Sequence, residues 1–308
     1  MATLYVTHPA FLTHEPPHGH PERPDRMRAI ERRLEDERFS TLVRERAHLG
    51  TPDLGYLAHP AEYVDELHDM APRDGLVSID PDTSMSPGTW EALMRGAGAV
   101  IQASDEVLSR QVDNAFCAIR PPGHHAERVR AMGFCFLNNA AIAARHVQHK
   151  HGIGRVAIID FDVHHGNGTQ DIFWEDSSVM YCSTHQMPCY PGTGARAERG
   201  VGNIVNCPLR PGEGSEEFID AFDTAILPAL DKFAPEFIII SAGFDAHSRD
   251  PLAQLNVHER DFGLVTRRLM DIADKHAGSR LVSVLEGGYD LEGLARSVDS
   301  HVSALMGM

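Results

Sequence analysis

Apolar runs alternate with amphipathic stretches along most of the chain. Short runs rich in Val, Ile, Leu and Phe lie at residues 4–7, 116–119, 156–159, 179–182, 237–240 and 281–285. Runs of this length are typical of strands buried on both faces of a parallel sheet. Helical spacing of apolar residues marks the segments 24–39, 90–108, 137–150, 216–230, 259–276 and 291–305. The alternation predicts an α/β fold with a mostly parallel, multi-stranded sheet and helices on both faces.

The pattern continues through the chain without a linker. No Gly/Ser/Pro-rich or low-complexity stretch divides the 308 residues, and no repeat of fixed period is present. We therefore expect a single domain over residues 1–308, which at this length buries roughly 75% of its unfolded surface.

The charge balance is acidic. The 28 Lys and Arg residues against 44 Asp and Glu residues give a formal net charge of −16, which opposes binding to nucleic acid and favours a cationic substrate. The first residues lack a basic segment followed by an apolar stretch, and no apolar run approaches the ~20 residues that span a bilayer. We expect a soluble, cytoplasmic protein with no membrane partner.

The cysteines indicate neither disulfides nor a thiolate metal site. Their number is odd and no pair is spaced as C-x-x-C. Most are expected to be reduced core residues, with Cys135 as an exception beside the candidate site. The five are Cys117, Cys135, Cys182, Cys189 and Cys207.

Polar residues follow four of the predicted strands. The segments RPPGHH, DFDVHHGNG, SAGFDAH and EGGYD come directly after the runs that begin at residues 116, 156, 237 and 281. Loops beyond the carboxyl ends of strands in an open α/β sheet converge on one crevice. We therefore expect these four segments to build a single site.

Asp162, His164 and Asp245 are the candidate metal ligands. Asp162 and His164 lie two residues apart at one strand end, and Asp245 follows another strand. Two carboxylates and one imidazole leave positions for water and substrate, as catalytic zinc requires, although an oxygen-rich set also suits ferrous iron or manganese. The alternative is a buried Asp–His pair that braces the sheet, and the three other polar strand ends favour the metal.

Three further residues are candidates for proton transfer and charge stabilisation. The rigid PPG turn before His124 and His125 would present both rings in a defined direction, as a stabiliser and a general acid/base. Tandem histidines are otherwise usually surface residues. Tyr289, after the last strand, can donate its hydroxyl to a developing oxyanion, whereas a tyrosine in GGY is more often a core residue.

Aromatic residues near these segments suggest a narrow passage. Phe134 in GFCF and Tyr190 in CYPGTG could form its walls, and core packing is the alternative. The start of the chain is rich in histidine, which we interpret as a loop near the pocket rim rather than a second metal site. These histidines are His8, His14, His18 and His20.

The motifs together resemble one enzyme family. RPPGHHA, GFCFLNNAAIAA, IIDFDVHHGNGTQ, YPGTG, SAGFDAHSRDPL and LEGGYDL occur in order over nearly the whole chain. They resemble the zinc-dependent histone deacetylases, especially class II and the bacterial acetylpolyamine-amidohydrolase-like branch. The resemblance implies an arginase/deacetylase-like fold and one deacetylase catalytic domain over residues 1–308.

The resemblance also implies the metal centre and the reaction. Asp162, His164 and Asp245 become ligands of one Zn²⁺ per chain, with Fe²⁺ or Co²⁺ as substitutes. The expected reaction is hydrolysis of an acetyl or short acyl amide on a lysine side chain or similar amine by metal-activated water. Tyr289 becomes the oxyanion donor, and its presence favours real activity.

The histidine pair has implied roles and implied partners. His125 becomes the general base and acid and His124 its electrostatic partner, with Asp160 holding the far nitrogen of His124 and Asn167 that of His125. Class I enzymes have an aspartate in place of Asn167. A neutral amide raises the pKa of His125 less than a carboxylate would, which favours the neutral base.

A potassium site and a substrate channel are implied as well. Structural K⁺ is expected at the backbone carbonyls of Asp160, Asp162 and His164 with the Ser183 hydroxyl. The expected channel residues are Gly133, Phe134, Tyr190 and Leu252. Eukaryotic acetylpolyamine specialists carry a glutamate where this chain has Leu252, so an apolar Leu252 favours acyl-lysine or general substrates, and acetylpolyamine is the alternative.

Two other functions are less well supported. An arginase-like ureohydrolase holds two manganese ions with a D-x-D motif, whereas Asp245 stands alone between Phe244 and Ala246. A non-catalytic acyl-lysine binder would have lost a ligand, a histidine or the tyrosine, and all are present. Oligomeric state has no signature here, and a homo-oligomer is compatible with the sequence.

Overall fold

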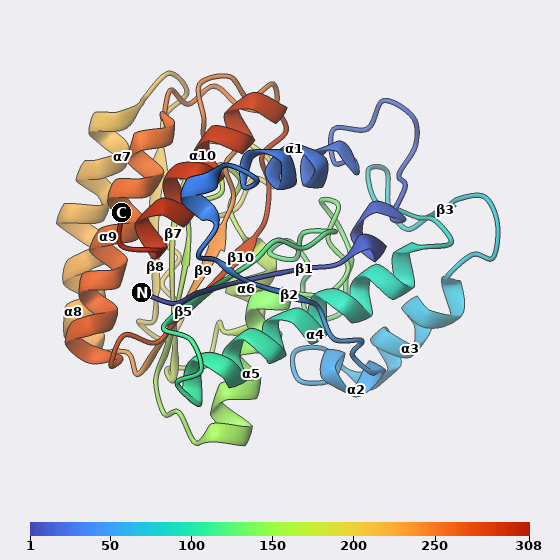
Figure 1. The fold of residues 1–308 in the computed structure, drawn as a ribbon, viewed down its shortest axis with the longest axis horizontal. Helices are drawn as coiled ribbons and strands as arrows, with labels where there is room; N and C mark the ends of the chain where they lie inside the picture. Colours follow the sequence, from blue (N-terminus) through green and yellow to red (C-terminus); the bar gives the residue numbers. More distant parts are fainter.

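An eight-stranded sheet organises the computed structural model, which describes residues 1–308 (Figure 1). The strand order is β2-β1-β5-β10-β9-β6-β7-β8, and every neighbouring pair is parallel. The strands are β1 Thr3–Thr7, β2 Val43–Arg46, β5 Asn114–Cys117, β6 Val156–Asp160, β7 Val179–Gln186, β8 Ile204–Leu209, β9 Phe237–Ala242 and β10 Leu281–Leu285. A short antiparallel pair, β3 Val77–Ser78 and β4 Ser84–Met85, lies outside this sheet.

Helices cover both faces of the sheet, as the alternating pattern predicts (Figure 1). Helices α4 and α5 pack on one face of the sheet. Helices α9 and α10 pack on the other face, and α1 packs against α10. The helices are α1 Asp25–Arg33, α2 Pro52–Gly55, α3 Ala61–Met70, α4 Thr89–Leu108, α5 Asn139–His151, α6 Asn167–Ile172, α7 Ser215–Ala221, α8 Leu227–Phe233, α9 Glu259–His276 and α10 Leu291–Leu305. None of them has the length and apolar character needed to cross a membrane.

The central strands are apolar because both of their faces are covered. Every residue of β5, β6, β9 and β10 is buried, and their apolar side chains belong to one continuous buried cluster. A strand buried on both faces has no exposed side on which a polar residue would be favoured. This explains why these strands appear in the sequence as nearly uninterrupted apolar runs.

Several elements differ from the sequence expectations. The edge strand β2 has the sequence VRER with all four residues exposed, so it lacks the apolar run that marks a buried strand. The expected helix 24–39 ends at Arg33, with a 3-10 turn at Glu37–Phe39. The expected helix 216–230 is divided by a π-helical segment, Phe222–Ile226, just before Pro228. Proline lacks the N–H that a continuing α-helix would use, which accounts for the interruption.

The central strands end at one level of the sheet. Asp160 of β6 is in register with Ser241 of β9 and with Ser183 of β7, and Leu285 of β10 is in register with Ala242 of β9. The four polar segments therefore leave the sheet at the same edge. Parallel alignment alone brings residues from distant parts of the sequence to one place.

Candidate metal centre and active site

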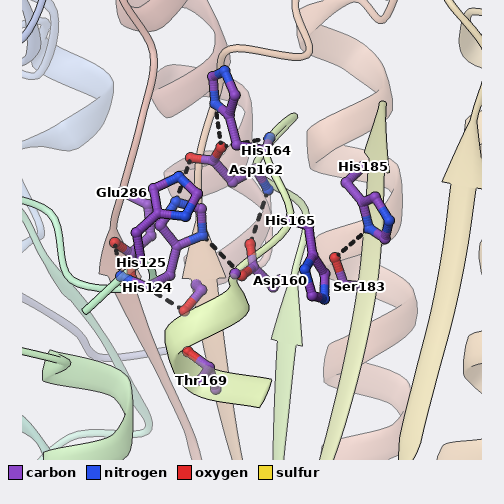
Figure 2. Close-up of polar contacts among 12 residues, drawn as sticks. His124, His125, Asp160, Asp162, His164, His165, Thr169, Ser183, His185 and Glu286 are labelled. Carbon is purple, nitrogen blue, oxygen red and sulfur yellow. Dashed lines mark hydrogen bonds and ion pairs between the residues drawn. The ribbon is translucent and has the colours of Figure 1, made fainter. Parts of the chain in front are cut away.

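Three side chains from two neighbouring strand ends form the centre of the site. His164 Nδ1 lies 3.1 Å from Asp162 Oδ1 and 3.1 Å from Asp245 Oδ2 (Figure 2 shows the pair Asp162 and His164). Both carboxylates are fully or almost fully buried and the imidazole is 8% exposed. Ligands of one tetrahedral zinc ion, each about 2.0–2.2 Å from the metal, stand at a similar distance from one another. The residues fit a metal ion with an open coordination position.

The remaining carboxylate oxygens are held by the backbone. Gly287 N donates to Asp162 Oδ2 at 2.8 Å, and Val163 N donates to Asp245 Oδ1 at 2.8 Å. A Cβ atom at Gly287 would stand 2.2 Å from Asp245 Oδ2, so no other residue allows this close approach. The ligand oxygens are thus oriented before any metal binds.

The electrostatics of this centre call for a cation. Burial, and after it the Asp162 carboxylate, raises the pKa of Asp245 to about 7. Burial lowers the pKa of His164, but the two carboxylates outweigh it and hold that pKa well above its ordinary value. Buried carboxylates that face one another need a proton or a metal ion between them, and the imidazole alone balances only one charge.

His124 is held by a buried carboxylate. Its Nδ1 lies 3.0 Å from Asp160 Oδ2, which also accepts a hydrogen bond from the Tyr181 hydroxyl at 3.0 Å. Burial alone would lower the pKa of His124, but Asp162 and Asp160 raise it to about 10. This imidazole therefore carries a positive charge at neutral pH.

His125 has the opposite character although it is the next residue. Its Nδ1 lies 2.8 Å from Asn167 Oδ1. Its ring centroid is 4.0 Å from that of His124 and 6.0 Å from that of His164, and these three rings are labelled in Figure 2. Burial, followed by the positive charges of His124 and His164, holds the pKa of His125 well below its ordinary value. A neutral imidazole beside a charged one suits a base.

Tyr289 lies at the same edge, on the loop after β10. Its ring is 9% exposed and meets the Phe134 ring edge to face, with centroids 5.9 Å apart. Burial raises the pKa of Tyr289 well above its ordinary value, although the Arg26 guanidinium opposes this. The hydroxyl therefore stays protonated and able to donate.

Two of the expected channel residues, Gly133 and Tyr190, lie beside His125. A Cβ atom at Gly133 would stand 2.6 Å from the His125 ring and 3.0 Å from the Tyr190 ring. The Tyr190 ring meets that of His125 at 5.1 Å between centroids, and it is 39% exposed. Leu252 is exposed to a similar extent, at 37%.

The histidines at the start of the chain have separate partners. His8 accepts a hydrogen bond from Ala10 N, and His14 is buried beside the Thr89 hydroxyl. His20 packs against Phe134 with centroids 4.5 Å apart, which places this part of the segment near the aromatic passage as expected.

Comparison with known proteins identifies the family. A family model described as the histone deacetylase domain matches residues 20–305. The chain belongs to the histone deacetylase family. A probable deacetylase of Archaeoglobus fulgidus is 42% identical over 302 residues, covering 95% of this chain and 83% of the relative. A histone deacetylase-like amidohydrolase of Pseudomonas aeruginosa is 39% identical, covering 88% of this chain and 73% of the relative.

The fold of this histone deacetylase-family enzyme is also found among solved structures. The crystal structure of the HDA15 HD domain matches with a TM-score of 0.94 and 36% identity, covering 99% of this chain and 88% of that one. The expected arginase/deacetylase-like α/β fold is confirmed. Family membership and the names of the relatives make the chain a hydrolase.

Four residues that support the candidate site were not predicted from the sequence. Glu286, fully buried, accepts hydrogen bonds from Gly123 N at 2.7 Å and His124 N at 3.1 Å (Figure 2). Glu286 opens the EGGYD segment that the sequence analysis singled out, but its contacts join segments far apart in the sequence, which a local pattern does not reveal. The other three residues are Arg26, Asp250 and Glu127.

Arg26 and Asp250 both act on the Tyr289 loop. The Arg26 guanidinium donates to the carbonyl oxygen of Gly288 at 2.7 Å and lies 5.0 Å from the centroid of the Tyr289 ring. Asp250 Oδ2 accepts from Tyr289 N at 2.7 Å, and its Oδ1 accepts from Leu252 N at 3.0 Å. The only local signal was the polar SRDPL stretch that contains Asp250.

Proposed function

We propose that this enzyme removes an acetyl or similar short acyl group from a lysine side chain or a similar primary amine by zinc-dependent hydrolysis. The observation that carries the proposal is the buried Asp162–His164–Asp245 centre beside a charged and a neutral histidine. Metal, base and oxyanion donor at one strand edge are the components of metal-assisted amide hydrolysis.

Asp162, His164 and Asp245 would hold one Zn²⁺ per chain, for which Fe²⁺ or Co²⁺ could substitute. When bound, the ion would polarise the acyl carbonyl and lower the pKa of water. The buried, preoriented carboxylates support this assignment.

His125 is the proposed base. Its Nδ1 faces the Asn167 amide oxygen and so carries the hydrogen, which leaves Nε2 free to take a proton from the attacking water. The low pKa of His125 keeps that nitrogen unprotonated at neutral pH, and a bound cation would shift it in the same direction. As the amide bond breaks, the histidine pair returns a proton to the leaving amine.

Tyr289 is the proposed oxyanion donor. Its buried hydroxyl stays protonated because burial raises its pKa by disfavouring the phenolate. Arg26 and Asp250 hold the ring and the backbone of this residue from two sides. A donor placed before the reaction stabilises the negative charge that develops on the carbonyl oxygen.

The rim supports a cationic substrate. Burial, followed by the Asp82 carboxylate, raises the pKa of Tyr190. Thr83 Oγ1 donates to Asp82 Oδ1 at 2.8 Å and accepts from Phe134 N at 2.9 Å, which ties this carboxylate to the wall of the passage. Acidic groups at the rim suit acyl-lysine in a basic peptide, and they also favour the alternative, an acetylpolyamine.

A structural potassium ion is part of the proposal. His185 Nε2 lies 2.9 Å from the Gly194 carbonyl oxygen, which only accepts, so His185 Nδ1 must accept from the Ser183 hydroxyl at 2.8 Å. The lone pairs of the Ser183 oxygen remain free for a cation. Carbonyl oxygens of Asp160, Asp162 and His164 would complete the K⁺ site, since Ser183 is in register with Asp160.

Two further points rest on the sequence. We propose that residues 1–308 form one catalytic domain, a proposal that the single main sheet and continuous apolar core support. We also propose a cytoplasmic location, with which the five free cysteines agree.

The test is a comparison of kcat/KM for acetyl-lysine peptides, trifluoroacetyl-lysine, acetylated putrescine and acetylated spermidine, using protein loaded with one zinc per chain. We expect hydrolysis that a chelator abolishes, and a KM for cationic substrates that rises with salt as rim charges are screened. A preference for the acetylated polyamines would identify them, rather than acyl-lysine, as the substrate class. If none of the compounds is hydrolysed, the proposal is refuted.

A further inference from the structure

We propose that Glu127 is a positioning residue for the base and acts through Asn167. Its carboxylate fixes the side-chain amide of Asn167 so that the amide oxygen faces His125. The consequence for turnover rests on the proposed function, whereas the effect on the His125 tautomer does not.

The three side chains form a continuous line. Asn167 Oδ1 lies 2.8 Å from His125 Nδ1, and Asn167 Nδ2 donates to Glu127 Oε1 at 2.7 Å. The amide nitrogen also lies 3.4 Å from Met132 Sδ. Asn167 is 5% exposed, so its amide has little access to water that could replace these partners.

Hydrogen-bond chemistry decides which way the amide faces. An ionised carboxylate only accepts, so the NH₂ group of Asn167 must point to Glu127 and its oxygen must point to His125. His125 Nδ1 then has to carry the hydrogen, and Nε2 has to keep its lone pair. An amide turned the other way would oppose this tautomer and would leave two acceptors facing each other at Glu127.

The backbone delivers Glu127 to this position. Gly168 N and Thr169 N of α6 donate to the His124 carbonyl oxygen at 3.0 and 3.2 Å, so the helix start docks on the histidine turn (Figure 2 labels Thr169). A Cβ atom at Gly168 would stand 2.2 Å from the Ala126 carbonyl oxygen. Glu127 N in turn donates to the Arg130 carbonyl oxygen at 3.0 Å, which closes a tight turn. Glu127 and Asn167 are therefore placed by the same contact.

A carboxylate at position 167 would behave differently. Its two oxygens are equivalent, so it needs no neighbour to orient it, and it would repel Glu127. A hydrogen-bond donor at position 127 would favour Asp over Asn at position 167. It would attract the Asp carboxylate, whereas it would turn the Asn amide oxygen toward itself and away from His125. The identities of residues 127 and 167 should therefore be coupled, which a double-mutant cycle measures.

The experiment uses the zinc-loaded full chain with Glu, Gln, Ala or Lys at position 127, each combined with Asn or Asp at position 167. With Asn167, we expect Glu127→Gln to keep kcat/KM within about 3-fold, since its amide oxygen still accepts. We expect Glu127→Ala to lower it about 10-fold and Glu127→Lys about 100-fold, the range typical of residues that orient a catalytic group. With Asn167→Asp, Glu127→Lys should raise kcat/KM instead of lowering it.

The second measurement is the ¹⁵N NMR spectrum of His125, assigned by comparison with His125→Ala. The unsubstituted protein and the Glu127→Gln protein should show Nδ1 as the protonated nitrogen, and the Glu127→Lys protein should lose this signature. Zinc content and the thermal midpoint of each variant show that the site and the fold remain.

Equal effects of Glu127→Lys in the presence and in the absence of Asn167→Asp would overturn the proposal, as would an unchanged His125 tautomer in the Glu127→Lys protein. If the unsubstituted enzyme hydrolyses no acylated amine, the proposed function fails, and the NMR comparison still decides the role of Glu127.

Discussion

Two clusters of histidine and aspartate in this molecule have similar compositions and different environments. Asp162, His164 and Asp245 lie at the strand edge, and Asp105, His146 and His151 join the ends of α4 and α5. Each offers three ligand atoms within 4.8 Å of one another. In the second cluster both imidazole Nε2 atoms lie 2.7 Å from the same Asp105 oxygen.

The difference lies in charge and distance. A separation of 2.7 Å is that of a charge-assisted hydrogen bond and leaves no room for a metal ion between the atoms, whereas the 3.1 Å separations at the strand edge leave more. Lys150 Nζ lies 2.7 Å from the other Asp105 oxygen and neutralises it. At the strand edge two buried carboxylates share one imidazole. Residue type alone therefore does not separate the two clusters, and what sets the candidate metal centre apart is a pair of buried carboxylates at one imidazole.

The largest expected effect is the loss of the metal. Asp245→Ala should leave too few ligands for stoichiometric zinc and should reduce activity to that of the metal-free protein. His151→Ala, the matched change in the Asp105–His146–His151 cluster, should keep one zinc per chain. Metal analysis of the purified proteins measures both. Retention of zinc by the Asp245→Ala protein, or its loss from the His151→Ala protein, would contradict the comparison.

The next largest effect is expected from a residue of the buried site that does not bind the metal. Tyr289→Phe should lower kcat about 10²-fold by removing an oxyanion donor, with zinc content unchanged. Tyr56→Phe is the control, since this exposed tyrosine donates to Asp65 Oδ1 at 2.6 Å on the surface. Steady-state kinetics and metal analysis are the measurements, and near-normal turnover would exclude the role of Tyr289.

The smallest effect concerns the stability that the Asp105–His146–His151 cluster contributes. Burial would raise the pKa of Asp105, but hydrogen bonds from Lys150, His146 and His151 lower it to about 2 from an ordinary 3.8. Because the folded pKa is the lower one, its stabilisation is complete above the ordinary value and is lost as pH falls toward about 2. Asp105→Asn should therefore lower the urea midpoint slightly at pH 7 and by a clearly smaller amount near pH 2. An equal shift at both pH values would show that its charge is not responsible.

The sequence was most informative where burial determines the residue types. The apolar runs predicted six strands of the main sheet, and their polar ends predicted which residues meet at one edge. The edge strand β2, with its exposed VRER sequence, could not be found in this way because pairing with β1 rather than side-chain burial defines it. The π-helical interruption at 222–226 likewise follows from packing around a proline, which periodicity does not describe.

The candidate site shows the same limit. Adjacent or nearly adjacent residues such as Asp162 and His164 were visible as motifs, whereas supporting residues outside the motifs, such as Arg26 and Glu127, were not. Arg26 is 262 positions from the Gly288 carbonyl that it binds, and Glu127 is 40 positions from Asn167. A motif shows which residues one segment provides, whereas the contacts between segments form only when the chain folds.

Asp250 has a consequence for attempts to change the substrate preference of this enzyme. One carboxylate accepts hydrogen bonds from the backbone of Leu252 on the surface loop and from the backbone of Tyr289, the proposed oxyanion donor. A loop grafted from another enzyme to alter selectivity would therefore also move this proposed donor unless it supplied an aspartate at the same place. Selection for new substrates should accept replacements of Leu252 more readily than insertions beside it, because the side chain can vary while the backbone must stay where Asp250 holds it.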